Sequence, residues 1–469
     1  MIQMSLAEVA EAVGGELTAG EGTVTGKVTV DSRAVASGDL FVAIPGERVD
    51  GHDYLGAAAA AGAVAALTTR PDGALPCVVV DEPVAALGRL AAAVHRRLSV
   101  GDLTTVGITG SSGKTSTKDL LGQVLATAGA TVSPPGSFNN DIGLPLTVLD
   151  ADEDTRFLVL EMGSRGRGHI ARLCRVARPD VGVVLNVGSA HLGEFGSADG
   201  IAVAKGELVE ALPAEGTAVL NADDPRVLGM APRTRAHVVT TGRAGDADVR
   251  AEDVVLDDSG RAGFALVTGG ERAPVRLRVV GEHQVANALS AAGAALAAGM
   301  TPGAVAAALS AAEPRSRWRM EVTRRADGVT VVNDAYNANP ESMRAALAAL
   351  AGLPARRRVA VLGAMAELGP GAADEHERLG RDAVAAGVDL VVAVGPDAVG
   401  IADGALAAGV GRGEGEGADE GAVRVPDRAA ARELLTEVLV PGDVVLVKAS
   451  RSYGLEVLAA ELLDAGAGA

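Results

Sequence analysis

The feature that most constrains this chain of 469 residues is the segment 104–117, which reads TTVGITGSSGKTST. A β-branched apolar run (104–109) leads into a turn of small residues, and a helical pattern with an apolar face follows Lys114 and Thr115. Together a strand, a small-residue turn and a helix N-terminus direct backbone N–H groups and the helix dipole at one point, which favours a bound phosphate. The strict Walker A spacing would need glycine at Ile108, so the match is to a variant of that motif. The segment predicts a nucleoside triphosphate site; the alternative is an ordinary strand-to-helix turn.

The overall charge argues against a surface for nucleic acid or anionic membranes. The chain has 42 basic and 60 acidic residues, a formal charge of −18, and only 2% aromatic residues for base stacking. Its two cysteines, Cys77 and Cys174, make neither a disulfide framework nor a metal-ligand spacing, which fits a reducing compartment. The first residues lack a signal-peptide pattern, and no segment reaches the roughly 20 apolar residues of a membrane span. We therefore expect a cytoplasmic protein without nucleic acid or membrane insertion, and a monomer as the simplest state.

Apolar strand-like runs alternate with helical patterns along the chain, which predicts α/β domains with mainly parallel sheets. The length exceeds that of a single core, and we expect three domains, over residues 1–100, 101–315 and 316–469. A glycine-rich acidic stretch, 404–421, is expected to form a surface loop without a site. Strands are expected at 28–30, 40–44, 77–80, 104–109, 157–161, 181–186, 219–220, 329–333, 359–362, 390–394 and 444–448.

Two polar residues follow central strands at the edge where α/β sheets bind ligands. Glu161 ends the run 157–161, and beside a phosphate site its carboxylate is better explained as a Mg²⁺ ligand than as a solvated loop residue. His191 follows the run 181–186 and would face the same edge, although a structural role is the default for a lone histidine.

Lys205 lies on the apolar face of a predicted helix, at helical spacing from Ile201, Leu208 and Val209. A lysine in such a position either extends its ammonium group to water or loses its charge. In the second case an amine of low pKa reacts with CO₂ to give a carbamate, an anion that can bind a metal. Both interpretations are open.

Three further polar clusters are NND at 139–141, NDAYNANP at 333–340 and KASRS at 448–452. The first precedes a glycine and a proline, and the other two follow apolar strand-like runs. Asn and Asp also serve as turn and cap residues, so a structural role is the alternative for the first two clusters, and a helix is expected to begin near Pro340. The third cluster brings two cations and two hydroxyls to a strand end, which suits a second contact with phosphate.

In this order, the motifs resemble those of the Mur ligases, the ATP-dependent amino-acid-adding enzymes of peptidoglycan synthesis. The resemblance covers nearly the whole chain. It rests on DSR at 31–33, GDLFVAIPGERVDGHDY at 38–54, GITGSSGKT at 107–115, FNNDIGLPLT at 138–147, EMG at 161–163, AHLGEFG at 190–196, AKGEL at 204–208, NADD at 221–224, HQVANAL at 283–289, RMEV at 319–322, NDAYNANPESM at 333–343, VLGAMAELG at 361–369 and VKASRS at 447–452.

The resemblance implies a small α/β domain for a UDP substrate, a central P-loop ATPase domain and a C-terminal Rossmann-like domain. It implies ATP and Mg²⁺ as cofactors, and UDP-N-acetylmuramoyl-tripeptide and D-alanyl-D-alanine as substrates. The reaction would be their ligation through an acyl phosphate, the last cytoplasmic step in making the peptidoglycan pentapeptide precursor.

The resemblance also implies roles for the matching residues. ATP would be bound by Gly110, Ser111, Ser112, Gly113, Lys114, Thr115, Ser116, Asn287, Arg319, Asp334, Tyr336 and Asn337. Mg²⁺ would be bound by Thr115, Glu161, His191 and a carbamylated Lys205. The substrates would contact Ser32, Arg33, Asn139, Asn140, Lys448 and Ser450. Lys114, Lys205 and His191 would be the catalytic residues.

Three alternatives compete with this interpretation. A sister ligase that adds a diamino acid to UDP-N-acetylmuramoyl-dipeptide would carry an Asp-Asn-Pro-Arg motif, which 333–343 lacks. Ligases similar to folylpolyglutamate synthase share the phosphate loop but would not explain the block 31–54. A non-catalytic ATP-binding regulatory module would leave the polar strand ends without a role.

Overall fold

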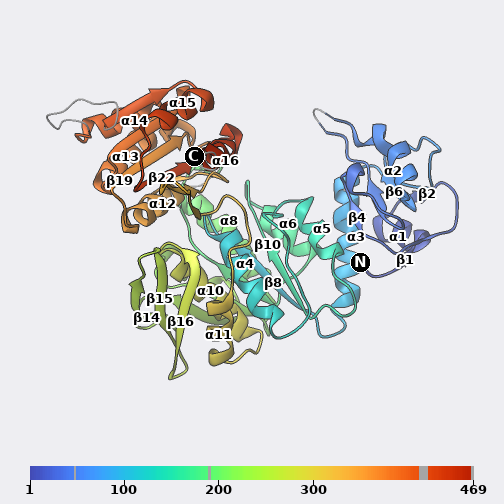
Figure 1. Ribbon diagram of the computed structural model, residues 1–469. Coiled ribbons are helices and arrows are strands. Elements are labelled where there is room, and N and C mark those ends of the chain that lie inside the picture. The colour runs from blue at the N-terminus through green and yellow to red at the C-terminus, as the bar shows by residue number, and fades with distance from the viewer. Residues whose placement is uncertain (47–48, 189–191, 411–420, 466–469) are drawn as a thin grey trace.

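The structure, a computed structural model, describes residues 1–46, 49–188, 192–410 and 421–465. Figure 1 shows three α/β units: an N-terminal unit on the right, a middle unit in the centre and below, and a C-terminal unit at the upper left. Each of the three large sheets draws its strands from one continuous stretch of the chain. The predicted three-domain α/β class is therefore confirmed. Within these ranges no helix combines the length and apolar character needed to cross a membrane.

The N-terminal unit is built on a small five-stranded sheet. Its elements are β1 (Met4–Ser5), α1 (Leu6–Val13), β2 (Glu16–Leu17), β3 (Thr23–Val24), β4 (Val28–Thr29), β5 (Leu40–Val42), α2 (Leu55–Ala61), β6 (Ala65–Thr68), β7 (Cys77–Val79) and α3 (Pro83–Leu98). The sheet order is β2-β7-β6-β5-β4, with β4 to β7 parallel, while β1 and β3 form a separate antiparallel pair.

The middle unit is a nine-stranded sheet covered by helices. Its elements are β8 (Thr104–Thr109), α4 (Lys114–Ala126), β9 (Thr131–Val132), α5 (Gly143–Leu149), β10 (Phe157–Glu161), α6 (His169–Val176), β11 (Val181–Val184), α7 (Leu192–Phe195), α8 (Ala198–Glu210), β12 (Thr217–Asn221), α9 (Pro225–Leu228), β13 (His237–Gly242), β14 (Val249–Leu256), β15 (Arg261–Thr268), β16 (Glu271–Val280), α10 (Gln284–Ala297) and α11 (Pro302–Ala311). The order is β16-β15-β14-β13-β12-β11-β8-β10-β9. Because β8 lies between β10 and β11 and all three are parallel, the loops that follow them meet at one edge.

Five strands of the middle sheet, β9, β13, β14, β15 and β16, lie outside the predicted runs. Strand β14 is parallel to β13, but β15 and β16 continue the sheet as an antiparallel hairpin. The middle sheet is thus mainly parallel, as expected, with an added antiparallel end over residues 261–280.

The N-terminal and middle units share one apolar core. Helix α3 packs against α5 and α6, and Leu87, Leu90 and Val94 lie in the same buried cluster as Leu144 and Val148. Buried apolar side chains exclude water at this junction, so the two units are joined by packing as well as by the chain.

The C-terminal unit is a six-stranded sheet. Its elements are β17 (Glu321–Arg324), β18 (Thr330–Asn333), α12 (Pro340–Gly352), β19 (Arg357–Gly363), α13 (Ala372–Ala385), β20 (Leu390–Val394), α14 (Val399–Ala407), β21 (Gly421–Val425), α15 (Arg428–Val438), β22 (Asp443–Lys448) and α16 (Leu455–Ala465). The order is β17-β18-β22-β19-β20-β21, and β17 alone among these strands is antiparallel to its neighbour.

The prediction of a surface loop over residues 404–421 is wrong at both ends. Residues 404–407 form the last turn of α14, Gly421 begins β21, and residues 411–420 lie outside the described residues. A Cβ on Gly404 would lie 1.9 Å from the Glu377 carbonyl oxygen, and one on Gly380 would lie 2.0 Å from the Ile401 carbonyl oxygen. These glycines let α13 and α14 cross with their backbones in contact, so here glycine serves packing rather than a loop.

The linker into the C-terminal unit has an unusual backbone on both sides of Arg319. Trp318 has φ of +59° and Met320 has φ of +50°, a region that costs non-glycine residues on the order of 1 kcal/mol each. Two contacts hold these conformations: the Met320 N–H donates to Asp334 Oδ1 (3.0 Å), and the Arg451 guanidinium lies 4.2 Å from the centre of the Trp318 ring. The direction of Arg319 is therefore fixed by its neighbours.

His95 on α3 predicts a measurable pH dependence of stability. Its Nε2 lies 2.9 Å from Thr105 Oγ1 on β8, and burial, with a smaller effect of Arg96, lowers its pKa from 6.5 to about 4. Because the unfolded chain binds this proton first, stability is lost as pH falls from 6.5 towards 4, by about 3 kcal/mol in total. In urea, the free energy of unfolding of wild type should therefore fall relative to that of His95→Gln as pH drops from 6.5 towards 4. A difference independent of pH would contradict the assignment.

Candidate active site

The predicted triphosphate loop lies between β8 and α4 and is held open by its neighbours. Gly113 has φ of +82° at the N-cap of α4, and a Cβ there would lie 2.4 Å from Asn287 Oδ1. Asn186, which follows β11, accepts from the Ser112 N–H through Oδ1 (2.9 Å) and donates through Nδ2 to the Ser112 carbonyl (3.2 Å). The Gly188 N–H donates to Ser111 Oγ (2.9 Å). These contacts leave the first turn of α4 facing the edge where β8, β10 and β11 end.

Lys114 begins α4 and bends back over the loop. Its Nζ donates to the Gly110 carbonyl oxygen (2.6 Å). Burial lowers the pKa of this amine, the Glu161 carboxylate opposes that effect, and the Arg319 guanidinium adds to it. A desolvated cation above a helix N-terminus is a strong attractor for a phosphate anion.

Thr115 and Glu161 form a buried pair of oxygen donors, 2% and 1% exposed. The Thr115 hydroxyl donates to Glu161 Oε2 (2.9 Å), and Glu161 Oε1 accepts from Ser137 Oγ (2.6 Å) and Asn139 Nδ2 (2.8 Å). A hydroxyl beside a carboxylate suits Mg²⁺, which binds proteins through one or two such oxygens and takes its other ligands from water and phosphate. In the described parts of the chain, no three His, Cys, Asp or Glu side chains gather into a metal cluster. The donor set fits a cation that arrives with a nucleotide.

The predicted helix around Lys205 is α8, and the predicted apolar face is confirmed. Ser197 caps the helix, its Oγ accepting from the Gly200 N–H (3.0 Å). Lys205 is 5% exposed, so its ammonium group is not extended to water. Burial, and secondarily the nearby Lys114, lower the pKa of Lys205 well below its usual range. The geometry therefore favours a neutral amine. His191, the other predicted partner of this lysine, lies outside the described residues.

Residues of the C-terminal unit and its linker touch the phosphate loop at two points. Arg319 Nη2 donates to Thr115 Oγ1 (2.8 Å), and its guanidinium lies 4.1 Å from the centre of the Tyr336 ring. Asn339, the N-cap of α12, donates through Nδ2 to the Ser111 carbonyl (3.5 Å). The structure therefore brings Arg319 and Tyr336 to the site, together with Asn287 from α10 and Gly110 and Ser116 at the two ends of the loop.

Asp334, Asn337, Lys448 and Ser450 join the strand ends of the C-terminal sheet to one another. Lys448 is 2% exposed, and its Nζ donates to Asp334 Oδ2 (2.6 Å) and to the Asn337 carbonyl (2.9 Å). Ser450 Oγ accepts from the Ala366 N–H (2.9 Å) and donates to the Ala338 carbonyl oxygen (3.4 Å). In this structure Lys448 and Ser450 support the turn 334–339, and their predicted contact with substrate stays a prediction.

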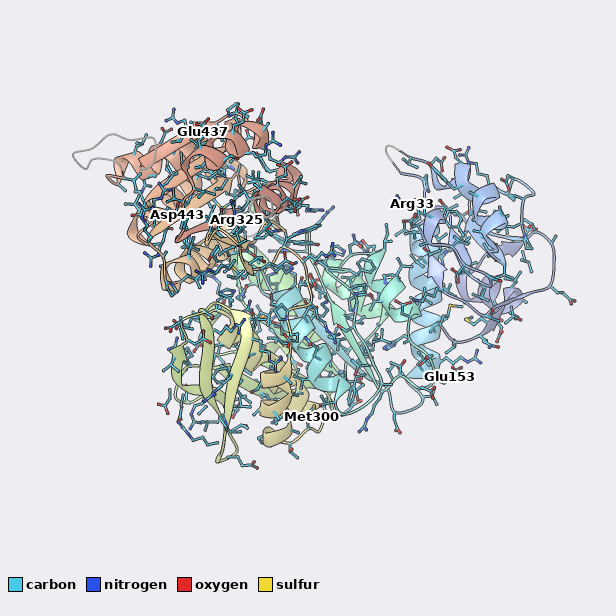
Figure 2. The ribbon with its side chains drawn as sticks, viewed as in Figure 1. Arg33, Glu153, Met300, Arg325, Glu437 and Asp443 are labelled. Carbon is cyan, nitrogen blue, oxygen red and sulfur yellow. The ribbon has the colours of Figure 1, made fainter. Side chains whose placement is uncertain are left out.

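The remaining predicted substrate residues occupy different places. Asn139 contacts Glu161, as described above, whereas Asn140 Oδ1 accepts from the N–H groups of Ile142 (3.1 Å) and Gly143 (2.8 Å) in the turn before α5. Arg33 lies on the N-terminal unit, 88% exposed, and pairs with Asp31 through Nε (2.8 Å) and Nη2 (2.7 Å) (Figure 2). Ser32 begins the short 3₁₀ helix Ser32–Ala34 beside it. No contact between described residues joins Ser32 or Arg33 to the phosphate loop.

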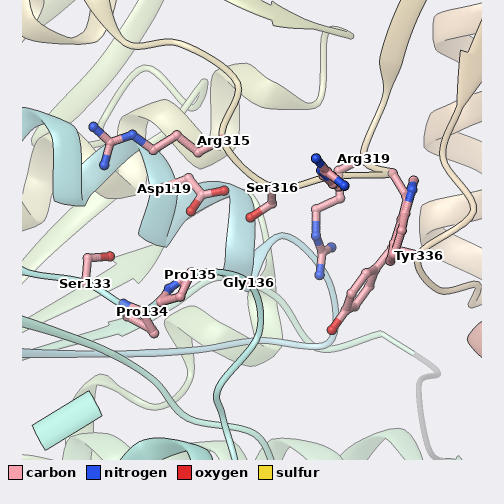
Figure 3. A pocket seen from close by; sticks show the side chains of 11 residues that line it. Asp119, Ser133, Pro134, Pro135, Gly136, Arg315, Ser316, Arg319 and Tyr336 are labelled. Carbon is pink, nitrogen blue, oxygen red and sulfur yellow. The ribbon is translucent and has the colours of Figure 1, made fainter. Parts of the chain in front are cut away.

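A cavity of about 610 Å³ adjoins the loop. It lies between α4, residues 133–136, the linker 315–319 and Tyr336. Figure 3 shows Arg319 beside Tyr336 on one side of it and Asp119 on the opposite side. The cavity gives room for a group that extends from the phosphate loop past the linker.

Sequence reasoning does not single out Asn186 and Ser137, two residues that the site depends on. Both carried a usable signal: Asn186 ends the predicted strand 181–186, and Ser137 lies two residues before Asn139. Asparagine and serine are so common in turns that neither position stands out without the spatial neighbour that uses it.

Arg319→Lys is expected to raise the KM for ATP about tenfold, since lysine cannot keep both the planar stack on Tyr336 and the hydrogen bond to Thr115. Steady-state kinetics at varied ATP measures the change. Arg325→Lys is the matched control, because Arg325 (labelled in Figure 2) also pairs through its guanidinium, with Asp327, but follows the end of β17 that is remote from Asn333 and Asp334. An equal effect of the two substitutions would contradict the assignment.

Comparisons with known proteins agree along the whole chain. Three family models match: the catalytic domain of the Mur ligase family over residues 26–104, the Mur ligase middle domain over 108–295, and the Mur ligase glutamate ligase domain over 318–451. The UDP-N-acetylmuramoyl-tripeptide–D-alanyl-D-alanine ligase of Mycobacterium tuberculosis is 50% identical, over 99% of this chain and 98% of the relative. The enzyme of the same name from Escherichia coli is 36% identical, over 99% of this chain and 100% of the relative.

Solved structures give the same result. MurF from Acinetobacter baumannii aligns with a TM-score of 0.87 at 31% identity, covering 98% of this chain and 99% of that chain. MurF ligase from Thermotoga maritima, solved in complex with ADP, aligns with a TM-score of 0.79 at 31% identity, covering 94% and 97%.

Proposed function

Because this chain belongs to the Mur ligase family, we propose that it joins D-alanyl-D-alanine to UDP-N-acetylmuramoyl-tripeptide, converting ATP to ADP and phosphate. The observation that carries the proposal is the meeting of Lys114, the Thr115–Glu161 pair and a buried Lys205 at one sheet edge. Such a site suits transfer of a phosphoryl group rather than nucleotide binding alone.

The three units divide the work. The N-terminal unit, residues 1–100, takes the UDP end of the first substrate, with Ser32 and Arg33 among its contacts. The middle unit, residues 101–315, binds ATP through the loop 110–116, and the C-terminal unit, residues 316–469, adds Asp334, Tyr336 and Asn337. The contacts of Arg319 and Asn339 with the loop support this division, since they bring the C-terminal unit against the nucleotide site.

A carboxylate does not acylate an amine at neutral pH, so the tripeptide carboxylate must first be activated. It attacks the γ-phosphorus of ATP in line, which forms an acyl phosphate and releases ADP. Lys114 and the N–H groups at the start of α4 bind the phosphate oxygens and lower the repulsion between two anions. The amine of D-alanyl-D-alanine then attacks the acyl carbon, phosphate leaves, and the nitrogen loses a proton. Closure of the C-terminal unit over the loop, to which Arg319 and Asn339 already make contacts, would exclude water from the acyl phosphate.

Cations fit two positions in this scheme. Thr115 and Glu161 would hold one Mg²⁺ with the phosphates of ATP, and His191 with a carbamylated Lys205 would hold a second near the acyl phosphate. When bound, Mg²⁺ offsets the charge that builds on the transferring phosphoryl group. The carbamate forms when the neutral Lys205 nitrogen attacks the carbon of CO₂ and loses one proton to water.

The proposal is tested by phosphate release from ATP with UDP-N-acetylmuramoyl-tripeptide, with and without D-alanyl-D-alanine, followed by the mass of the product. We expect release that needs both substrates, and a product heavier by one dipeptide unit. Release with UDP-N-acetylmuramoyl-dipeptide and a diamino acid instead would assign the chain to the sister ligase. ATP binding with no release for any acyl substrate would favour a regulatory module.

A further inference from the structure

Lys118 is a buried lysine that the mechanism above does not use. It lies on α4 one helical turn after Lys114 and is 1% exposed. The chain has five lysines among its 42 basic residues, and four of them (Lys114, Lys118, Lys205 and Lys448) lie in or beside the candidate active site. A lysine is rarely buried without a partner, so the contacts of Lys118 indicate what it does.

The ammonium group of Lys118 ties helix α4 to the segment 133–139. Its Nζ donates to the Pro134 carbonyl oxygen (2.6 Å) and pairs with the carboxylate of the adjacent Asp119. Pro134 and Pro135 have no N–H groups to donate, and the buried Pro134 carbonyl oxygen accepts from Lys118. One turn further along α4, a Cβ on Gly122 would lie 2.9 Å from Ser133 Cβ and Oγ. The helix thus holds both residues at the start of the segment.

The same segment ends on the carboxylate of Glu161. Ser137 Oγ and Asn139 Nδ2 both donate to Glu161 Oε1, while Thr115 on α4 donates to Oε2. Asn139 also donates to Ser137 Oγ (2.9 Å), so the two donors form one unit. Each oxygen of Glu161 is therefore oriented from α4, one directly and the other through the segment that Lys118 anchors.

We propose that Lys118 is a positioning residue for the cation site: by fixing the segment 133–139 to α4 it holds Ser137 and Asn139 against Glu161, and so sets the direction of that carboxylate. The inference rests on the proposed function, because it assumes that Glu161 binds a divalent cation with the nucleotide. Groups that orient a metal ligand from outside typically contribute roughly 10–100-fold to metal affinity.

The experiment is titration of the intact protein with Mn²⁺ at saturating ADP, followed by the electron paramagnetic resonance signal of protein-bound Mn²⁺. We compare wild type with Lys118→Met, Ser137→Ala and the double variant. Each single substitution should weaken Mn²⁺ binding roughly 10–100-fold. The double variant should be little weaker than either single one, since both substitutions remove the same hold on Glu161. Lys118→Arg, which keeps a cationic donor, should recover part of the affinity.

Gln123→Met is the matched control, because Gln123 also joins α4 to a distant carbonyl, that of Glu313 (2.9 Å), but on the linker side. It should leave Mn²⁺ affinity unchanged. Gly122→Ala tests the same segment without removing a charge: its new methyl group presses on Ser133, and Mn²⁺ binding should weaken.

An unchanged Mn²⁺ affinity in folded Lys118→Met would overturn the proposal, as would additive effects in the double variant. If Lys118→Met does not fold, a folded Gly122→Ala with wild-type affinity overturns it equally. In each of these cases wild type still binds Mn²⁺ and the ligase assay is unaffected, so the proposed function stands. Wild-type protein that binds no Mn²⁺ with ADP would overturn the cation site and this inference together.

Discussion

Replacing Lys114 with methionine should lower kcat about 10²–10³-fold at saturating ATP, which is the usual effect of removing one fixed charge aimed at a developing oxyanion. The side chain bends over the phosphate loop and has the Gly110 carbonyl as its hydrogen-bond partner, so its charge is available to a phosphate oxygen. Initial rates of phosphate release with both acyl and amine substrates measure the change.

Stability gives an independent check on the same variant. Burial lowers the pKa of Lys114, so its charge opposes folding at neutral pH, and methionine should leave the thermal midpoint unchanged or higher. Lys27→Met is the matched control, since Lys27 is an exposed lysine of the N-terminal unit and should affect neither rate nor midpoint. A Lys114→Met protein with nearly wild-type kcat would refute the role given to this residue.

Lys205→Ala should lower kcat about 100-fold or more, because the proposed carbamate, which would complete a cation site, cannot form on alanine. The wild-type protein in ¹³C-labelled bicarbonate should show a carbamate carbon by NMR that the variant lacks. Small carboxylates such as acetate should restore part of the activity, since alanine leaves space for a separate anion where the carbamate stood.

The pH dependence follows from the lowered pKa of Lys205. A lysine whose folded pKa lies below its unfolded value lowers the free energy of unfolding as pH falls below the unfolded pKa. Lys205→Ala therefore has two opposing effects on stability: it removes apolar packing by the lysine stem, and it removes this unfavourable charge. The carbamate signal should fade as pH drops through the folded pKa, because only the neutral amine reacts with CO₂. A variant that keeps full activity, or a wild-type spectrum without a carbamate carbon, would exclude this chemistry.

Local patterns were enough to predict much of the fold and part of the site. The runs 104–109, 157–161 and 390–394 are strands with the predicted limits, because a buried parallel strand is rich in apolar and β-branched residues and ends close to the polar loop. Lys205 was also identified from its close neighbours, because a charged residue is unusual on the apolar face of a helix. Both signals lie within a few neighbouring residues.

Features that depend on distant partners could not be predicted in this way. Strand β16 alternates buried Val275 and Leu277 with exposed Arg276 and Arg278, a period of two that the many arginines obscure. Lys448, which is predicted to contact a substrate, donates to Asp334 in this structure, and only the adjacency of β18 and β22 makes that contact possible. Asn139 and Asn140 are neighbours in the same motif, yet Asn139 donates to Glu161 and Asn140 closes the turn before α5.

The linker described above has a practical consequence, since Trp318 is the single tryptophan of the chain. Its indole is stacked under Arg451 of the C-terminal unit and lines the cavity beside the phosphate loop. Fluorescence excited at the long-wavelength edge of protein absorption therefore comes from Trp318 alone, at the junction between the middle and C-terminal units. The native chain carries its own optical reporter of nucleotide arrival and domain movement, and needs no attached dye.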